Sequence, residues 1–290
     1  MDFERALIAK TGARNALQAC DRVVRQFLSE DTDRGQAIDL RDLAKSLNIA
    51  IEDKTSLVTE GEIERDGDGA ATIRLRGGSS RRRERFTLAH EIGHWMLYQV
   101  MADEAGLGRG KLFRGLSACS DEVRQEEWLA NLLAAELLLP RESLLQYFRT
   151  PVERIMPRLA HMCRRFAVSR LAAIRRIADV MGANILWLEL LPRDASDPAS
   201  TCMIDDAALV TSGAGMLYAR ERTRLLREVA FGDLVGSEFV SLDLMSPKGR
   251  LSAVFECEIV DLPIRHAYAM QAFDVSWRRP TRIGSSEMEF

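Results

Sequence analysis

The stretch from Phe86 to Tyr98, FTLAHEIGHWMLY, constrains this chain more than any other. It places His90, Glu91 and His94 in the spacing His-Glu-x-x-His. On a helix, residues four apart lie on one face, so both imidazoles can bind one metal ion while Glu91 stays beside it. The pattern is typical of a zinc hydrolase. Because catalytic zinc takes three protein ligands and a water, a third ligand must come from elsewhere in the chain.

The third ligand does not follow the extended metzincin motif, because the positions of its Gly and final His are Leu97 and Val100 here. A carboxylate from a following helix is the next choice. Residues 121–140, DEVRQEEWLANLLAAELLLP, predict that helix, with acids in the first turns and a proline at the end. Glu127 shares a helix face with small and polar groups, which allows close approach of a second helix. Glu126 is the alternative, although its apolar stripe is typical of ordinary core.

Two separated motifs carry a family resemblance: RFTLAHEIGHWML at 85–97, and E-x-x-A-N-x-L-A-x-x-L-L-L-P at 127–140. Together with IDLRDLAKSLNIAIE and GEIERDGDGAATIRL upstream, they resemble the ImmA/IrrE family of metallo-endopeptidases up to about residue 180. The family usually has Phe where Leu133 stands. The resemblance implies a zincin-like, mainly helical peptidase domain with a small β-sheet. It also implies one Zn²⁺ per chain, held by His90, His94 and Glu127, with Glu91 catalytic.

In such a site, Glu91 would take a proton from the attacking water and return one to the leaving amine, while zinc polarises the peptide carbonyl. Tyr98, one turn beyond His94, is predicted as a second donor to the oxyanion. Asn131 is predicted to orient a ligand or the neighbouring backbone.

Composition places the chain among ordinary soluble globular proteins, with 290 residues, 47% hydrophobic and 29% charged. The net charge of −3 gives no overall attraction to nucleic acid or anionic membrane. The N-terminus, MDFERALIAK, has no apolar signal region, and no run of about 18 apolar residues occurs. These features predict a cytoplasmic protein without membrane contact. The five scattered cysteines predict reduced thiols.

The segment before the zinc motif predicts a helical stretch over 3–29 and a short helix opened by Asp39 or Asp42 and ended by Asn48. Strands are expected at 49–52, 62–65 and 71–76, with the turn DGDG at 66–69 between the last two. The edge of such a sheet could hold an extended peptide by strand addition. Between the two metal helices, residues 101–120 read as a glycine-rich linker.

Residues 151–181 predict a helix-turn-helix-like pair, with Ser169 as the N-cap of its second helix. This segment contains seven arginines and two acidic residues, so its local net charge is +5 in a protein that is acidic overall. DNA contact is one interpretation and a purely structural helical pair is the other. Four arginines are predicted as contacts to nucleic acid or to a partner: Arg164, Arg165, Arg170 and Arg175.

Beyond residue 181, strands are expected at 184–191, 239–244 and 251–259, and a helix at 215–231. The predicted fold class is therefore α+β in three parts: a zinc metallopeptidase domain (1–148), a helix-turn-helix-like segment (149–182) and a mixed α/β domain (183–290). By analogy with relatives, the last part is compared with GAF or PAS sensors.

The family resemblance further implies a substrate, a helix-turn-helix transcriptional repressor. A limited cut in it would release repressed stress-response or mobile-element genes. The alternative is a regulator that does not cleave and acts through DNA or protein contacts of the basic helical segment. The intact Glu91 favours catalysis, since a pure binding module has no need of a general base.

Overall fold

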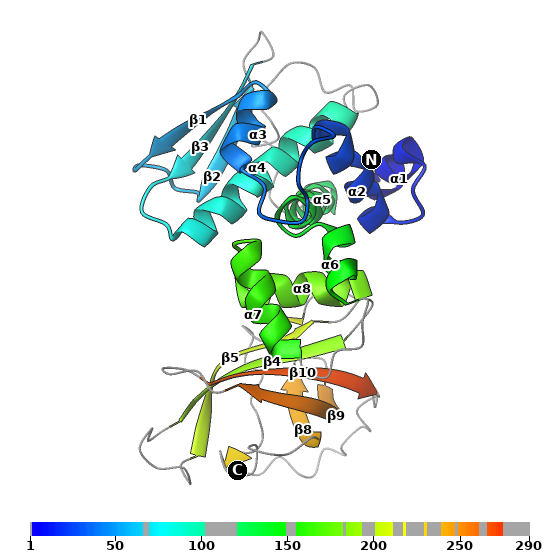
Figure 1. Ribbon diagram of the computed structural model, residues 1–290, viewed down its shortest axis with the longest axis vertical. Helices are drawn as coiled ribbons and strands as arrows, with labels where there is room; N and C mark the ends of the chain where they lie inside the picture. Colours follow the sequence, from blue (N-terminus) through cyan, green and yellow to red (C-terminus); the bar gives the residue numbers. More distant parts are fainter. Residues whose placement is uncertain are drawn as a thin grey trace. The chain divides into compact units, whose positions relative to one another are not determined.

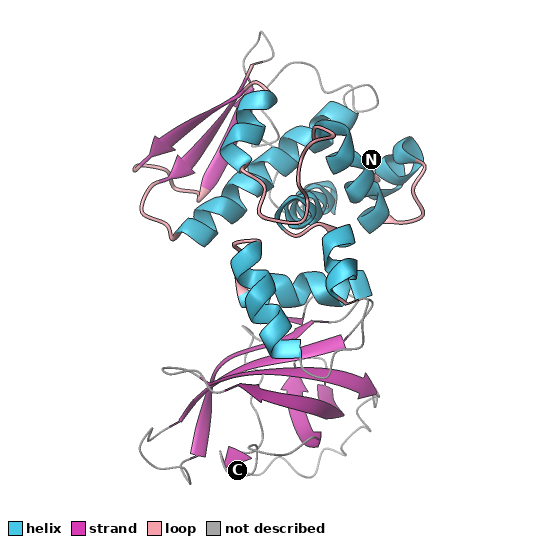
Figure 2. Ribbon diagram, in the orientation of Figure 1, coloured by secondary structure: helices cyan, strands magenta, loops and turns pink. Residues whose placement is uncertain are grey.

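The computed structural model describes residues 2–65, 70–101, 121–148 and 155–181, together with the backbone of the strands from residue 184 to 274 whose bounds are given below. The chain divides into two compact units. One contains residues 1–149 and 161–172, and the other contains residues 150–160 and 173–290. Figure 2 shows that helices dominate the first unit, whereas the described residues from 184 onward are strands.

Two short helices open the chain, α1 (Phe3–Thr11) and α2 (Ala16–Phe27). Gly12 ends α1 at φ 62°, a left-handed conformation that favours glycine. Asn15 then caps α2, its side chain accepting from the amide of Gln18 at 2.9 Å. The helical stretch predicted over 3–29 is therefore two helices, because local capping interrupts it.

The short helix α3 (Leu40–Ser46) follows. The carboxylate of Asp39 accepts from the amides of Arg41 and Asp42, and Asn48 adopts φ 58° just after the helix. Asp39 therefore opens this helix, and the predicted end at Asn48 is confirmed.

Three strands form the predicted small sheet: β1 (Ile49–Lys54), β2 (Gly61–Arg65) and β3 (Ala71–Arg76). Their order is β1-β3-β2, with β1 parallel and β2 antiparallel to β3. The central strand buries alternate residues, which places its apolar face against a helix. The turn predicted at 66–69 lies outside the described residues.

Helix α4 (Arg81–Met101) contacts β2 and β3 on one side and the helix α5 (Asp121–Leu138) on the other, with α1 and α2 nearby. Figure 1 shows α4 running between the sheet and these helices. A short helix, α6 (Arg141–Tyr147), follows α5 after Pro140. The long helix predicted over 121–140 is thus confirmed, whereas residues 102–120 of the predicted linker lie outside the described part.

Helices α7 (Ile155–Arg165) and α8 (Arg170–Met181) form the predicted pair of helices with a break between them. At the break, Ala167 has φ 53°, and the hydroxyl of Ser169 accepts from the amide of Ala172 at 3.2 Å. The N-cap predicted at Ser169 is therefore confirmed.

The second unit contains a seven-stranded sheet in the order β6-β5-β4-β10-β9-β8, with β7 paired to β5 and every pairing antiparallel. Its strands are β4 (Asn184–Pro192), β5 (Thr201–Val210), β6 (Leu217–Tyr218), β7 (Val229–Ala230), β8 (Phe239–Ser246), β9 (Gly249–Val260) and β10 (His266–Asp274).

The three strands expected in this region are confirmed by β4, β8 and β9. The helix expected over 215–231 is wrong wherever that stretch is described, because both described pieces of it pair with β5 as strands. The α+β class is confirmed by the helical first unit and its three-stranded sheet. The comparison with GAF or PAS sensors is not confirmed, and the three-part domain division stays a prediction. None of the helices in the described part of the chain combines the length and apolar character that a membrane span requires.

Candidate metal centre

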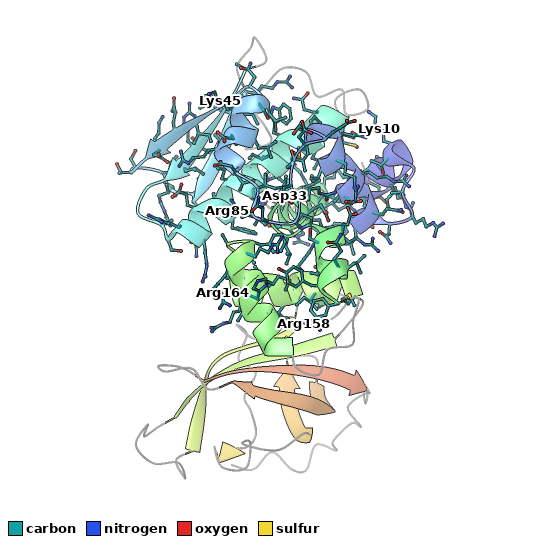
Figure 3. All side chains as sticks on the ribbon, in the orientation of Figure 1. Lys10, Asp33, Lys45, Arg85, Arg158 and Arg164 are labelled. Atoms are coloured by element: carbon teal, nitrogen blue, oxygen red, sulfur yellow. The ribbon has the colours of Figure 1, made fainter. Side chains whose placement is uncertain are left out.

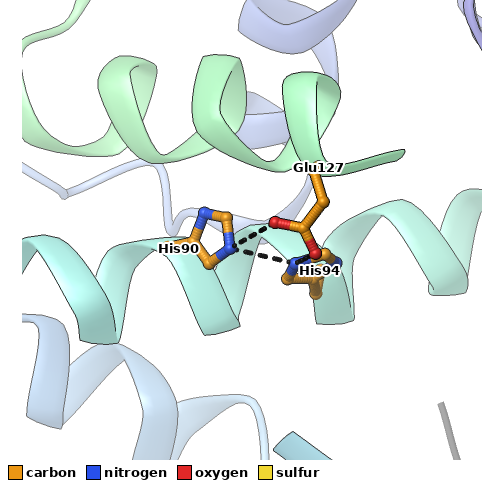
Figure 4. A group of neighbouring side chains, drawn as sticks. All are labelled: His90, His94 and Glu127. Carbon is orange, nitrogen blue, oxygen red and sulfur yellow. Dashed lines mark hydrogen bonds and ion pairs between the residues drawn. The ribbon is translucent and has the colours of Figure 1, made fainter. Parts of the chain in front are cut away.

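Helix α4 carries His90 and His94 one turn apart on the same face. Their Nε2 atoms lie 3.1 Å apart, and the two rings are nearly perpendicular at 87°. His94 is buried, His90 is half-buried, and Phe86 stacks on the ring of His90 with centroids 6.2 Å apart. Both Nε2 atoms therefore face one point beside α4 (Figure 4).

Helix α5 brings Glu127 to the same point. Its Oε2 lies 3.3 Å from Nε2 of His90, and its Oε1 lies 3.4 Å from Nε2 of His94. Within the described residues, these three side chains form a group whose ligand atoms all lie within 4.8 Å of one another. The side chain of Glu127 is 53% exposed, so water can reach the group from that side.

The separations are close to those between ligand atoms that share a zinc ion. With zinc–ligand bonds of about 2.0–2.1 Å, two ligand atoms at a tetrahedral angle lie about 3.3–3.4 Å apart. In this group the two Nε2 atoms lie 3.1 Å apart, and each lies 3.3 or 3.4 Å from a different oxygen of the Glu127 carboxylate. Two imidazoles and one carboxylate are also the ligand set of catalytic zinc sites that keep a position for water.

The surroundings of His94 favour a positive charge at this group. Burial alone would lower the pKa of His94, but its hydrogen bonds with Glu126 and Glu127 outweigh burial and raise that pKa to about 9. Hydrogen bonds from His90 and His94 hold the pKa of Glu127 far below its ordinary value. The group therefore favours a cation between its ligand atoms, which is the electrostatic property that a metal site needs.

The approach of α5 to α4 depends on Gly93. A Cβ added there would lie 2.8 Å from the backbone oxygen of Ala130 and 3.2 Å from Cβ of Leu133. Contacts under 3.0 Å are essentially never seen for a Cβ. Gly93 and Ala130 thus form the close helix–helix contact that brings Glu127 within reach of both imidazoles.

Glu126 lies on a stripe that is buried in the core, as its apolar pattern predicted, but it does more than pack there. The residue is buried, with 4% of its surface exposed, but its Oε1 accepts from Nδ1 of His94 at 3.0 Å. Sequence reasoning considered Glu126 as a ligand and missed it as a hydrogen-bond partner of one. The available signal was a carboxylate on an apolar helix stripe, since a buried charge requires a partner.

Tyr98 also turns toward Glu126. It is buried, and its hydroxyl donates to Oε1 of Glu126 at 2.5 Å. Burial, followed by this hydrogen bond, raises the pKa of Tyr98 well above its usual range. A hydroxyl committed to Glu126 gives no support to the predicted role of Tyr98 as donor to the oxyanion.

Glu91 lies on α4 beneath the strand β2 and is 8% exposed. A Cβ on Gly61 would lie 3.1 Å from Oε1 of Glu91 and 2.4 Å from Cγ2 of Thr87. Glycine at the start of β2 therefore lets the strand backbone lie against the carboxylate. Glu91 lies against the outer strand β2 of the small sheet and is close enough to His94 to interact with it electrostatically.

The remaining predicted site residues are on the surface or only half-buried. Asn131 is exposed one turn after Glu127 on α5, and its orienting role stays a prediction. Arg164, marked in Figure 3, is exposed on α7. Arg165 is exposed too, but its guanidinium donates to the carbonyl of Gly35. Arg170 and Arg175 are half-buried, and contact of these arginines with nucleic acid stays a prediction.

Comparison with known proteins identifies the domain that contains this group. Residues 44–178 match the model of the Peptidase_M78 family, described as the IrrE N-terminal-like domain. No curated protein matches the chain at a significant level. Among solved structures, the chain is similar to a Mycobacterium tuberculosis transcriptional regulator, with 16% identity, a TM-score of 0.43, and coverage of 94% of this chain and 81% of that one. A score at that level does not establish a common fold.

The family match and the geometry agree on one region of the chain. The matched range contains α4 and α5 and with them both motifs, including all three members of the His90–His94–Glu127 group. The domain at residues 44–178 belongs to the ImmA/IrrE family of metallopeptidases.

Proposed function

We propose that this chain is a zinc-dependent endopeptidase that makes a limited cut in a helix-turn-helix transcriptional repressor and so derepresses stress-response or mobile-element genes. The observation that carries the proposal is the convergence of His90, His94 and Glu127, whose ligand atoms all lie within 4.8 Å of one another. Membership of a metallopeptidase family supports the metal and the reaction class.

When bound by these three residues, zinc supplies a Lewis acid that polarises a peptide carbonyl and makes water more acidic. Glu91 is the general base, because it follows His90 directly and lies at the edge of the group. It takes a proton from the attacking water and delivers it to the leaving amine. Its burial beneath β2 places this proton transfer in a setting of low dielectric constant, where a carboxylate interacts strongly with neighbouring charge.

The strand β2 is the proposed docking element for the peptide. It is an outer strand of the three-stranded sheet, and its first residue, Gly61, lies against Glu91. An extended substrate segment that pairs with β2 would therefore pass the catalytic carboxylate, with main-chain hydrogen bonds supplying affinity. This mode suits a cut in an extended linker of a repressor.

A repressor substrate places the activity in the cytoplasm, where such proteins meet DNA. The antiparallel sheet of the second unit is proposed to sense the signal that starts cleavage, as GAF and PAS domains do. The family resemblance supports both assignments.

The test is incubation of the zinc-loaded protein with the helix-turn-helix repressor encoded nearest to it, beside Glu91→Gln under the same conditions. The proposal expects one specific cut, made by the wild type alone and located by mass spectrometry. An intact repressor in the presence of zinc-loaded wild type and a range of inducing signals would contradict it.

One observation favours a second function, that of a regulator that does not cleave. Arg164 is exposed on α7, in the helical segment 151–181 whose local net charge is +5. Arg164→Ala should then weaken retention of a promoter fragment and reduce the salt dependence of binding. Unchanged binding in this variant would argue against DNA contact through Arg164 and leave only protein contacts for such a regulator.

A further inference from the structure

Glu126 lies at the side of His94 that faces away from the group of ligand atoms. Nε2 of His94 points toward His90 and Glu127, whereas its Nδ1 lies 3.0 Å from Oε1 of Glu126. The two glutamates are neighbours on α5, and a rotation of about 100° per residue sends them to opposite nitrogens of one imidazole. Glu126 is therefore not a fourth member of the ligand group.

This contact selects the tautomer of His94. A carboxylate only accepts, so Nδ1 must carry the proton and donate it to Glu126. In the neutral imidazole, Nε2 is then left with a lone pair directed at the position where a metal ion would bind. His90 differs, because its Nδ1 is buried and has no hydrogen-bond partner among the described residues.

Tyr98 keeps Glu126 in place for this contact. It lies one turn after His94 on α4, and its hydroxyl donates to the same Oε1 at 2.5 Å. Two donors on one oxygen offset the cost of burying the carboxylate, which has 4% of its surface exposed. Rotation of Glu126 away from His94 would break both hydrogen bonds at once.

We propose that Glu126 and Tyr98 are positioning residues that orient His94 and fix its tautomer for zinc, so that His94 is the preorganised ligand of the centre. This inference rests on the proposed zinc site. A carboxylate on the far nitrogen also makes the imidazole a stronger ligand, and loss of such partners typically lowers metal affinity about 10- to 100-fold.

The test measures zinc affinity by competition with a chromophoric chelator, so it does not depend on peptidase activity. The main variant is Glu126→Leu combined with Tyr98→Phe, which removes both polar groups at similar volume and takes the hydrogen-bond partner from Nδ1 of His94. We expect its zinc dissociation constant to rise about 10- to 100-fold. Glu126→Gln retains an oxygen that can accept from Nδ1, so it should lose less affinity than the double variant.

Glu136 provides the matched control. It is a fully buried acid on the same helix, but it accepts from Arg34 at 2.7 Å and from the amide of Arg141 rather than from a ligand. Glu136→Gln should lower the melting temperature and leave zinc affinity unchanged. In nitrogen NMR of the zinc-loaded wild type, the Nδ1 proton of His94 should exchange slowly with water, and the double variant should lose this protection.

A folded double variant that binds zinc as the wild type does would overturn the positioning role. Complete loss of zinc in Glu126→Gln, equal to that in Glu127→Ala, would overturn it in a different way, by making Glu126 a ligand. A wild-type protein that binds no zinc at all would instead refute the proposed function, so the two failures are distinguishable.

Discussion

Glu126 and Glu127 carry the same functional group at adjacent positions, yet the fold gives them opposite surroundings. The side chain of Glu127 is 53% exposed and faces two Nε2 atoms, whereas that of Glu126 is 5% exposed and accepts from His94 and Tyr98. The helical pattern correctly separated the two residues by face. It could not show the hydrogen bond of Glu126, because the partner lies 32 residues away on another helix.

Gly61→Ala tests the placement of Glu91. The added methyl group would lie 2.4 Å from Cγ2 of Thr87 and 3.1 Å from Oε1 of Glu91, so both side chains must shift to make room for it. We expect kcat to fall at least about tenfold, since small displacements of a catalytic group have large effects, while zinc content is unchanged. Gly77→Ala is the control, because its nearest contact would be 3.6 Å. Equal activity in both variants would refute this role for Gly61.

The pH dependence of the metal-free protein follows from His94. Its pKa is about 9 in the folded chain and about 6.5 when unfolded, so the folded state holds the proton more tightly. The resulting stability is fully present below pH 6.5 and is lost as pH rises through 9. The free energy of unfolding in urea should therefore decrease by on the order of 2 kcal/mol across this window. The decrease should be much smaller in His94→Gln, and an equal decrease there would assign the effect to other groups.

At the scale of elements, the metal centre depends on one helix–helix contact. Gly93 and Ala130 let α4 and α5 approach until Glu127 reaches the imidazoles, and β2 covers the other side of α4 at Glu91. Helix periodicity and capping signals predicted these elements, because their determinants are local: Asp39 at α3, Ser169 at α8, the apolar stripe of α5. The pattern of small residues also predicted that the two helices would approach closely.

Gly93→Ala separates helix propensity from packing. Alanine is favoured over glycine within a helix by about 1 kcal/mol, so propensity alone would stabilise the protein. The methyl group would, however, lie 2.8 Å from a backbone oxygen of α5 that cannot rotate away. We expect net destabilisation of about 1–3 kcal/mol by chemical denaturation and a weaker zinc affinity. A higher melting temperature with unchanged zinc binding would show that the helices do not need this glycine.

At the scale of the whole molecule, prediction from sequence was good for the first unit and poor for the second. The strand β10, HAYAMQAFD, is rich in residues that favour helices, and it is a strand because it pairs with β4 and β9 on both sides. The apolar pattern of β5 is interrupted by Asp205 and Asp206, so it gives no clear strand signal. Residues 217–218 were expected to be helical, but pairing with β5 determines their conformation. Such long-range pairing is not visible in a local pattern.

Zinc removal should destabilise the protein, because the ion would tie α4 to α5 within one unit. Saturation at about a thousand times the dissociation constant stabilises a folded protein by about 4 kcal/mol. A chelator should therefore lower the melting temperature of the wild type by several degrees. His90→Ala should melt at the same temperature with and without chelator, and a chelator effect in this variant would point to zinc bound elsewhere.

The most direct test of the central claim is the zinc content per chain measured together with turnover for wild type, Glu91→Gln and Glu127→Ala. We predict one zinc ion per chain in the wild type and in Glu91→Gln, with turnover of the latter reduced at least about 100-fold. Glu127→Ala should lack both zinc and activity. Full zinc content in Glu127→Ala, or normal turnover in Glu91→Gln, would contradict the assignment of ligand and base.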